Sequence, residues 1–377
     1  MAGKTNFDEL RIFLPNNACS ENAALLTQYL FIKDAKKKEE KKQLLIKKFN
    51  FEEEQLSNAE DFFTKKKIPF CAKQNPTFTF IDLFAGIGGF RLAMQANGGE
   101  CVFSSEWDAS AKQTYYENYG EVPFGDITKF EPKDIPDFDV LAGGFPCQPF
   151  SSIGKREGFE HKTQGTLFFY IAKIIKEKKP KAFILENVQG LLTHAEGKTF
   201  QTILDVLENE LNYNVNTKVL NSSDYKVPQE RKRLYFVGFR KDVFSEKFIF
   251  PSPCKDKVGI GKFIEKDAEG PVISEHLQKT YIFKKDDGHP EIVDENSNFP
   301  VKTLCASYHK IQRITGTFVK GGKTGLRLLT EKECKAIMGF PKNFKIPVSR
   351  TQMYHQFGNS VAVPVVEKIA EAIVAHL

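Results

Sequence analysis

From Thr77 onward, short runs of apolar and β-branched residues alternate with amphipathic stretches, and this alternation constrains the fold more than any other feature. The runs lie at residues 78–84, 101–105, 140–142, 182–185, 215–220 and 234–239. Strands separated by helical segments build a mostly parallel sheet with helices on both faces. We therefore predict a doubly wound α/β fold, closed by an amphipathic helix over residues 361–377 that packs on the main sheet.

The alternation is absent from two other parts of the chain. Residues 1–75 carry Lys-rich and Glu-rich blocks, which predict a charged helical extension, with Ser57 and Glu60 spaced as a capping box. A solvated appendage and a DNA-contacting or self-regulating module remain alternatives for it. Residues 241–327 are rich in Pro, Gly, Lys and Asp and predict a second, smaller domain. The large domain then comprises residues 76–240 and 328–377.

Composition narrows the class of protein. The 377 residues and the net charge of +6 allow one or two cores and hint at an anionic partner such as nucleic acid. We see no run of about 18 apolar residues and no secretory signal, and so expect a cytoplasmic protein without a membrane segment. The seven cysteines are scattered, with no Cys-x-x-Cys pair, so we expect neither a disulfide framework nor a metal site.

Glycines and acids mark the ends of the first predicted strands. The glycine-rich segment 82–90 follows the first strand, where glycines let the backbone approach a ligand. Arg91 stands where a dinucleotide fingerprint needs its third glycine, which argues against a nicotinamide-dependent oxidoreductase. Glu106, Trp107 and Asp126 follow later strands, where carboxylates can bind ribose hydroxyls or an amino group and an indole can cover an adenine. Each acid alone is more often a surface group, but together they favour an adenosyl ligand without a pyrophosphate.

A cysteine and a carboxylate follow the next two strands. Cys147 lies in a loop between two prolines, and this position suits a reactive thiolate, although most lone cysteines are buried and inert. The polar, Gly-containing stretch 152–165 predicts a lid. Glu186 stands at a strand end where an unpaired carboxylate would be costly, and Arg231 and Arg233 can supply guanidinium groups to it, to a base or to a phosphate.

Six segments occur in the order seen in DNA (cytosine-5)-methyltransferases. They are residues 84–89, 144–148, 186–188, 229–233, 327–341 and 358–361. Over residues 77–377 the chain closely resembles the bacterial members of that family. The resemblance implies the class I S-adenosylmethionine-dependent fold and methylation of carbon 5 of cytosine within a short duplex DNA sequence. A tRNA cytosine-5 methyltransferase and a catalytically inactive DNA-binding relative remain alternatives.

The same resemblance implies roles for individual residues. It makes Cys147, Glu186, Arg231 and Arg233 catalytic. It implies contacts to S-adenosylmethionine, or to its product S-adenosylhomocysteine, from Phe84, Ala85, Gly86, Ile87, Gly88, Glu106, Trp107, Asp126, Ile127, Pro146, Leu167, Asn359 and Ser360. Thiolate addition at carbon 6 makes carbon 5 nucleophilic, and Glu186 can stabilise charge on the ring. Because a stacked base cannot present carbon 6, the target must swing out of the duplex.

The chain between Asn296 and Thr330 contains Lys and Arg but no Asp or Glu, which predicts a basic face toward double-stranded DNA. The expected DNA-binding residues are Ser151, Ser152, Gln229, Thr303, Lys310, Gln312, Arg313 and Lys320. Arg313, Gln312 and His309 have the chemistry to read purine edges, although phosphate contact or plain solvation is commoner for any single side chain.

One position departs from the family pattern. Family members often have a serine six residues after the cysteine, where this chain has Ile153, so the lid residue that fills the space of the flipped base stays open. We expect a monomer. A cognate restriction endonuclease is a candidate partner, since such enzymes commonly act beside one. The sequence does not give the DNA site.

Overall fold

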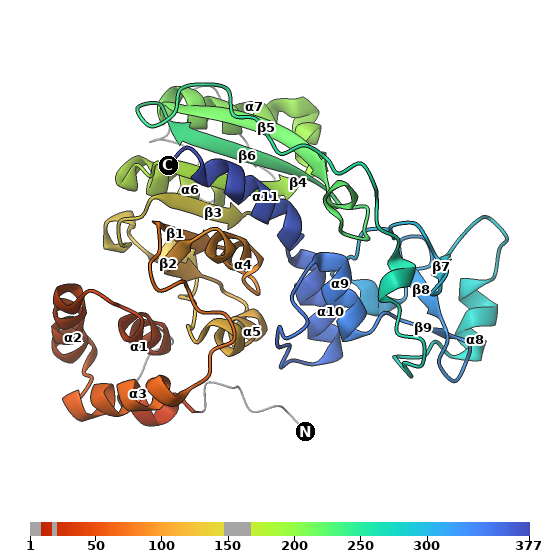
Figure 1. Cartoon of the computed structure of the whole chain (residues 1–377), viewed down its shortest axis with the longest axis horizontal. Coiled ribbons are helices and arrows are strands. Elements are labelled where there is room, and N and C mark those ends of the chain that lie inside the picture. Colours follow the sequence, from red (N-terminus) through yellow and green to blue (C-terminus); the bar gives the residue numbers. More distant parts are fainter. Residues whose placement is uncertain (1–8, 17–20, 147–166) are drawn as a thin grey trace.

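The computed structural model describes residues 9–16, 21–146 and 167–377 of the chain (Figure 1). Its centre is a six-stranded sheet in the order β2-β1-β3-β4-β6-β5. The strands are β1 (Phe78–Leu83), β2 (Gly99–Ser105), β3 (Val140–Gly144), β4 (Ala182–Val188), β5 (Tyr213–Asn221) and β6 (Lys232–Arg240). Within this sheet β6 is antiparallel to both of its neighbours, whereas β1, β2, β3 and β4 pair in parallel. The predicted α/β fold with a mostly parallel sheet is confirmed.

Helices cover both faces of this sheet. On one face lie α4 (Gly89–Ala96) and α11 (Val363–Val374), and on the other α6 (Leu167–Lys178) and α7 (Lys198–Asp205) (Figure 1). Along β3, Val140 and Ala142 belong to the core beneath α4 and α11, whereas Leu141 belongs to the core beneath α6. Burial on both faces explains why the central strands β1, β3 and β4 read as continuous apolar runs. The helix α11 confirms the predicted closing helix.

Among the described residues of the N-terminal part are the α-helices α1 (Asn22–Leu30), α2 (Ala35–Phe49) and α3 (Glu53–Lys65). They lie beside β2 and α5 (Ala109–Tyr119), and the apolar side of α1 joins the core beneath α6 (Figure 1). The expected capping box was misplaced: α3 begins after Glu52, whose N–H donates to the Gln55 side chain at 3.0 Å, and Ser57 lies inside the helix. The Glu52 side chain in turn accepts from the Gln55 N–H, so Glu52 and Gln55 take the capping-box roles expected of Ser57 and Glu60.

A second, three-stranded sheet lies at the other end of the molecule (Figure 1). Its strands are β7 (Glu291–Val293), β8 (Thr317–Lys320) and β9 (Leu326–Arg327), next to the short helix α8 (Glu275–Leu277). Helices α9 (Glu331–Met338) and α10 (Arg350–Asn359) lie between the two sheets in the view of Figure 1. The strand expected before Asp126 is reduced to one bridge between Ser105 and Phe124. Among the described residues, no helix combines the length and the apolar character needed to cross a bilayer.

Candidate active site

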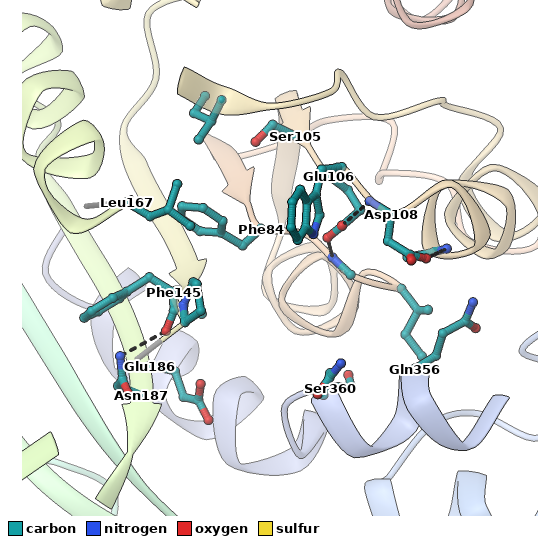
Figure 2. Close-up of a pocket in the computed structure, with 18 of the residues that line it drawn as sticks. Phe84, Ser105, Glu106, Asp108, Phe145, Leu167, Glu186, Asn187, Gln356 and Ser360 are labelled. Atoms are coloured by element: carbon teal, nitrogen blue, oxygen red, sulfur yellow. Dashed lines mark hydrogen bonds between the residues drawn. The ribbon is translucent and has the colours of Figure 1, made fainter. Parts of the chain in front are cut away.

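A cavity of about 670 Å³ opens where the carboxyl ends of β1 to β4 approach α10 (Figure 2). Residues from both expected sets line it. The expected cofactor residues in its wall are Phe84, Gly86, Ile87, Glu106, Trp107, Asp126, Ile127, Pro146, Leu167, Asn359 and Ser360. Three of the expected catalytic residues, Glu186, Arg231 and Arg233, line the same cavity. The fold thus joins in one space two groups of side chains that lie far apart in the sequence.

The turn after β1 forms one wall of the cavity. Gly86 has a φ of +54° and faces open space, so the backbone there is accessible to a ligand. Gly88 has a φ of +85°, and a Cβ at that position would lie 2.3 Å from the ring of Tyr119. Gly88 and the buried Ala85 do not line the cavity. Gly88 therefore serves close packing of α4 against α5, which differs from the contact expected of it.

Two carboxylates are held in fixed orientations on this wall. Glu106 accepts hydrogen bonds from the N–H groups of Gly86 and Asp108, each at 2.8 Å. Burial raises the pKa of Glu106, and these two N–H groups oppose that rise. Asp126 accepts from the N–H of Thr128 at 3.0 Å and from its hydroxyl at 2.8 Å. Both oxygens of Glu106 and the Oδ2 atom of Asp126 keep lone pairs that a ligand hydroxyl or amino group can use.

The arginine that breaks the dinucleotide fingerprint has a packing role. Arg91 is buried on α4, where its Nε donates to Gln95 at 2.6 Å and its Nη1 donates to the Tyr115 hydroxyl at 3.1 Å. It also forms a buried ion pair with Glu121. These contacts tie α4 to α5 and to the segment beyond it, behind the turn that lines the cavity.

The other side of the cavity carries a buried acid and a cation. Glu186 Oε1 lies 2.9 Å from Arg233 Nε. In the antiparallel pairing of β4 with β6, Arg233 lies opposite Val188, which is two residues from Glu186 and on the same face of the strand. Burial raises the pKa of Glu186, and the positive charges of Arg233 and Arg231 partly offset that rise. Burial therefore favours the protonated form of Glu186 more than water would, and the two arginines favour the ionised form.

Arg231 lines the cavity, and both of its terminal nitrogens donate to backbone carbonyls, whereas its buried Nε has no partner among the described residues. Its guanidinium donates to the carbonyl of Leu304 at 3.3 Å, of Gly358 at 3.0 Å and of Ser360 at 2.6 Å. Burial and the nearby charge of Arg233 lower the pKa of Arg231 to about 10. These bonds join the turn before β6 to the end of α10 and to the segment near Leu304. These bonds let Arg231 position the segments that meet at the cavity, and its expected catalytic role stays a prediction.

Asn187 is a functional candidate to which the sequence analysis assigned no role. Its Nδ2 donates to the Phe145 carbonyl at 2.9 Å, and this bond holds the end of β4 against the loop after β3 (Figure 2). Its place beside Glu186 in a family segment was the available signal. The loop leads to Cys147, which lies outside the described residues, as do Ser151, Ser152 and Ile153. Asp108 and Gln356 also line the cavity and were missed.

Two side chains that were expected to contact DNA form hydrogen bonds within the protein instead. Gln229 is fully buried, where its amide donates to the Ile337 carbonyl at 2.6 Å and accepts from the Leu304 N–H at 2.7 Å. The Thr303 hydroxyl donates to the Glu230 carbonyl at 2.6 Å. Both side chains fasten the segment near Leu304 to the turn before β6. The expected outward role of Gln229 is thus corrected.

The prediction of a basic face between residues 296 and 330 is wrong for its two arginines, because both are buried. Arg313 is 4% exposed; its guanidinium binds Asp287 and donates to the carbonyl of Ile282 at 2.8 Å. Arg327 is 1% exposed and pairs with Glu333 at 2.8 Å. Both acids come from outside the segment, where a local reading of charge cannot find them.

Lys310, Gln312 and Lys320 are exposed, unlike the two arginines. Lys320 pairs with Asp294 at 3.0 Å, an acid from outside the segment, and still keeps its side chain on the surface. Lys310 and Gln312 remain accessible to a nucleic-acid partner.

Comparisons with known proteins identify the family of the chain. The profile of the family described as C-5 cytosine-specific DNA methylase matches residues 78–375. The chain is 60% identical over 296 residues to the type II methyltransferase M.MspI of Moraxella sp, covering 78% of this chain and 70% of that protein. It is 40% identical over 325 residues to M.HhaI of Haemophilus parahaemolyticus, covering 81% of this chain and 97% of that protein.

Solved structures share the fold. The crystal structure of a Spodoptera frugiperda DNMT2 mutant superposes with a TM-score of 0.65 at 23% identity, covering 79% of this chain and 100% of that chain. At this identity the likeness shows the fold alone. The profile match and the close relatives decide the family: the chain belongs to the C-5 cytosine-specific DNA methylases.

Proposed function

We propose that this DNA cytosine-5 methyltransferase takes its methyl group from S-adenosylmethionine and acts through a covalent bond between Cys147 and the target base. One observation carries the proposal. The Glu186–Arg233 pair lines the same cavity as the carboxylates of Glu106 and Asp126. A ligand held by the latter two can therefore meet a base held by the former.

The donor set on the cofactor side suits an adenosyl ligand. The oriented Glu106 carboxylate can accept from two ribose hydroxyls, and Asp126 can accept from the adenine amino group. Trp107 is 84% exposed at the cavity wall and can cover the adenine ring. S-adenosylmethionine bound there would supply the methyl group to carbon 5.

On the opposite side, the protein's own groups prepare the cytosine. The Cys147 thiolate adds to carbon 6, and the ring electrons shift toward carbon 5 and nitrogen 3. Glu186 shares its proton with nitrogen 3, and Arg233 orients Glu186 and can bind the base carbonyl. After methylation, water takes the proton from carbon 5, the bond between carbon 6 and sulfur breaks, and the departing Cys147 thiolate leaves an aromatic ring. Arg231 and Asn187 hold the segments that carry these groups.

DNA engagement requires the target base to leave the stack, at a cost of a few kcal/mol. In our proposal residues 241–327 form the target-recognition domain and supply contacts that offset this cost, through exposed side chains such as Lys310 and Gln312. Residues 76–240 and 328–377 form the catalytic domain. Because its relatives M.MspI and M.HhaI are named type II methyltransferases, we also propose a restriction-modification system with a cognate endonuclease.

The first experiment reads the methylated site. Bisulfite sequencing of DNA from a host that expresses the chain gives the sequence context directly. Purified protein is then assayed for methyl transfer to duplex DNA of that context and to tRNA. Activity confined to tRNA would contradict the proposed substrate.

The second experiment tests the nucleophile. Duplex DNA with 5-fluorocytosine at the target carbon should form an adduct that survives denaturation, because fluorine blocks the elimination that frees the cysteine. Cys147→Ser should form no adduct, whereas Cys254→Ser, a change at an exposed cysteine outside the cavity, should form it normally. An adduct that persists in Cys147→Ser would assign the bond to another group.

A further inference from the structure

The N-terminal extension is fastened to the cofactor side of the cavity at two points. The Glu21 carboxylate, at the start of α1, accepts from the Gly125 N–H, with Oε2 at 3.1 Å from the nitrogen. The Thr27 hydroxyl, fully buried on the same helix, accepts from the Val122 N–H at 3.0 Å. Both bonds reach the short segment 122–126, which ends in Asp126.

The segment 122–126 is also bound to the cavity from the other side. The Phe124 N–H donates to the Ser104 carbonyl at 2.9 Å, and the Phe124 carbonyl accepts from the Glu106 N–H at 2.8 Å. Gly125 and Asp126 themselves line the cavity. The segment thus lies between α1 and β2, and it forms only a single bridge in place of a full strand. A segment with so little sheet pairing depends on its other neighbours for a fixed position.

Glu21 packs directly on this segment. A Cβ built on Gly125 would lie 2.7 Å from Glu21 Oε1, so the carboxylate occupies the space that any other side chain would need. Burial lowers the pKa of Lys112 on α5, and the negative charges of Glu21 and Glu106 both oppose that change. Glu21 therefore belongs to the same electrostatic surroundings as the carboxylate expected to bind the ribose.

We propose that Glu21 is a positioning residue for cofactor binding, and that the helical extension is part of the cofactor-binding unit. This inference rests on the proposed function, namely that S-adenosylmethionine occupies the cavity. Glu21 acts through the Gly125 N–H: it holds the backbone that carries Asp126, and so sets the affinity for the adenosyl group. The contact gives the extension a task beyond that of a solvated appendage.

The experiment measures the affinity of the full-length protein for S-adenosylhomocysteine by calorimetry. Glu21→Ala should weaken binding by about 3- to 30-fold, because a hydrogen bond to a charged acceptor is lost. Glu21→Gln keeps an acceptor oxygen and should bind within about twofold of the unchanged protein. Glu53→Ala, at an exposed carboxylate on α3 that pairs with Lys42 at 3.5 Å, is the matched control and should change nothing.

Steady-state kinetics separate positioning from a general loss of structure. In Glu21→Ala the KM for S-adenosylmethionine should rise while kcat at saturation is kept, because the Glu186 side of the cavity is untouched. If kcat and the melting temperature both fall while the affinity for S-adenosylhomocysteine is unchanged, the contact is merely structural and the proposal is overturned.

A second variant keeps Glu21 in place. Gly125→Ala should displace the carboxylate and weaken binding, whereas adding Gly125→Ala to Glu21→Ala should cost little more, since the space is then free. The single variant Gly125→Ala tests the role of Glu21 even if Glu21→Ala fails to fold. Unchanged affinity in Gly125→Ala, or losses that simply add, would overturn the role of Glu21. Failure of the unchanged protein to bind S-adenosylhomocysteine would instead contradict the proposed cofactor site, and the inference with it.

Discussion

Arg233 Nε and Glu186 Oε1 lie 2.9 Å apart across the antiparallel pair of β4 and β6. The pair combines a carboxyl group whose pKa is raised by burial with a cation that partly offsets the rise. Burial favours the protonated form of Glu186 and Arg233 favours the ionised form, so the two partners together set its protonation.

Glu186→Gln should lower the rate of methyl transfer by about 10²- to 10⁴-fold, the usual worth of general acid catalysis. The amide keeps the shape of the side chain, so binding of S-adenosylhomocysteine should be retained. Single-turnover transfer to the cognate duplex measures the effect, with Glu196→Gln at an exposed position as the control. A rate near that of the unchanged enzyme would exclude proton sharing by Glu186.

Arg233→Met should raise the pKa of Glu186 further, because the largest opposing charge is removed while burial remains. If protonated Glu186 is the active form, the loss of activity with rising pH should move to higher pH. The pKa can be followed by carbon NMR of labelled glutamate and compared with the pH profile of single-turnover rates. Arg240→Met, at the far end of β6 where Arg240 pairs with Asp242, should leave both unchanged. A shift to lower pH would contradict the assignment.

Asp82→Asn should make stability less dependent on pH. Asp82 is fully buried on β1, and burial raises its pKa well above the ordinary value, opposed by the charge of Arg91. A raised folded-state pKa contributes stability that is fully present below the unfolded pKa of about 3.9 and is lost as pH rises through the folded pKa.

Urea unfolding at a series of pH values measures this effect. The fall in unfolding free energy above about pH 4 should be smaller in Asp82→Asn than in the unchanged protein. Asp286→Asn, at an exposed position, should keep the original slope. Equal slopes in all three proteins would show that Asp82 does not carry the proton.

Arg313→Ala and Lys310→Ala should differ in their effects on the melting temperature and on the salt dependence of DNA affinity. Arg313 is bound to Asp287 and to the carbonyl groups of Ile282, Lys285 and His289, so its loss should lower the melting temperature. Lys310 is exposed, so its loss should leave melting unchanged but reduce the salt dependence of DNA affinity by about one phosphate contact. A reduced salt slope in Arg313→Ala with normal melting would restore Arg313 as a DNA contact.

The sequence by itself determined the sheet and the chemistry of its edge. The central strands of the large sheet were visible because they are buried on both faces and therefore read as apolar runs. The residues after those parallel strands meet at one edge of the sheet by topology. Glu106 and Glu186 were found in this way, and both line the cavity. These features depend on residues close together in the chain.

Only the tertiary structure decided which charges face outward and which segments support the site. Arg313 and Arg327 lie in a stretch without acids, but Asp287 and Glu333 approach them from outside it and bury them. Likewise Glu21, which precedes α1, contacts Gly125 across 104 positions of sequence. The physical reason is the same in both cases. Charge pairing and hydrogen bonding depend on distance in space, and side-chain direction and long-range packing set that distance without leaving a local pattern in the sequence.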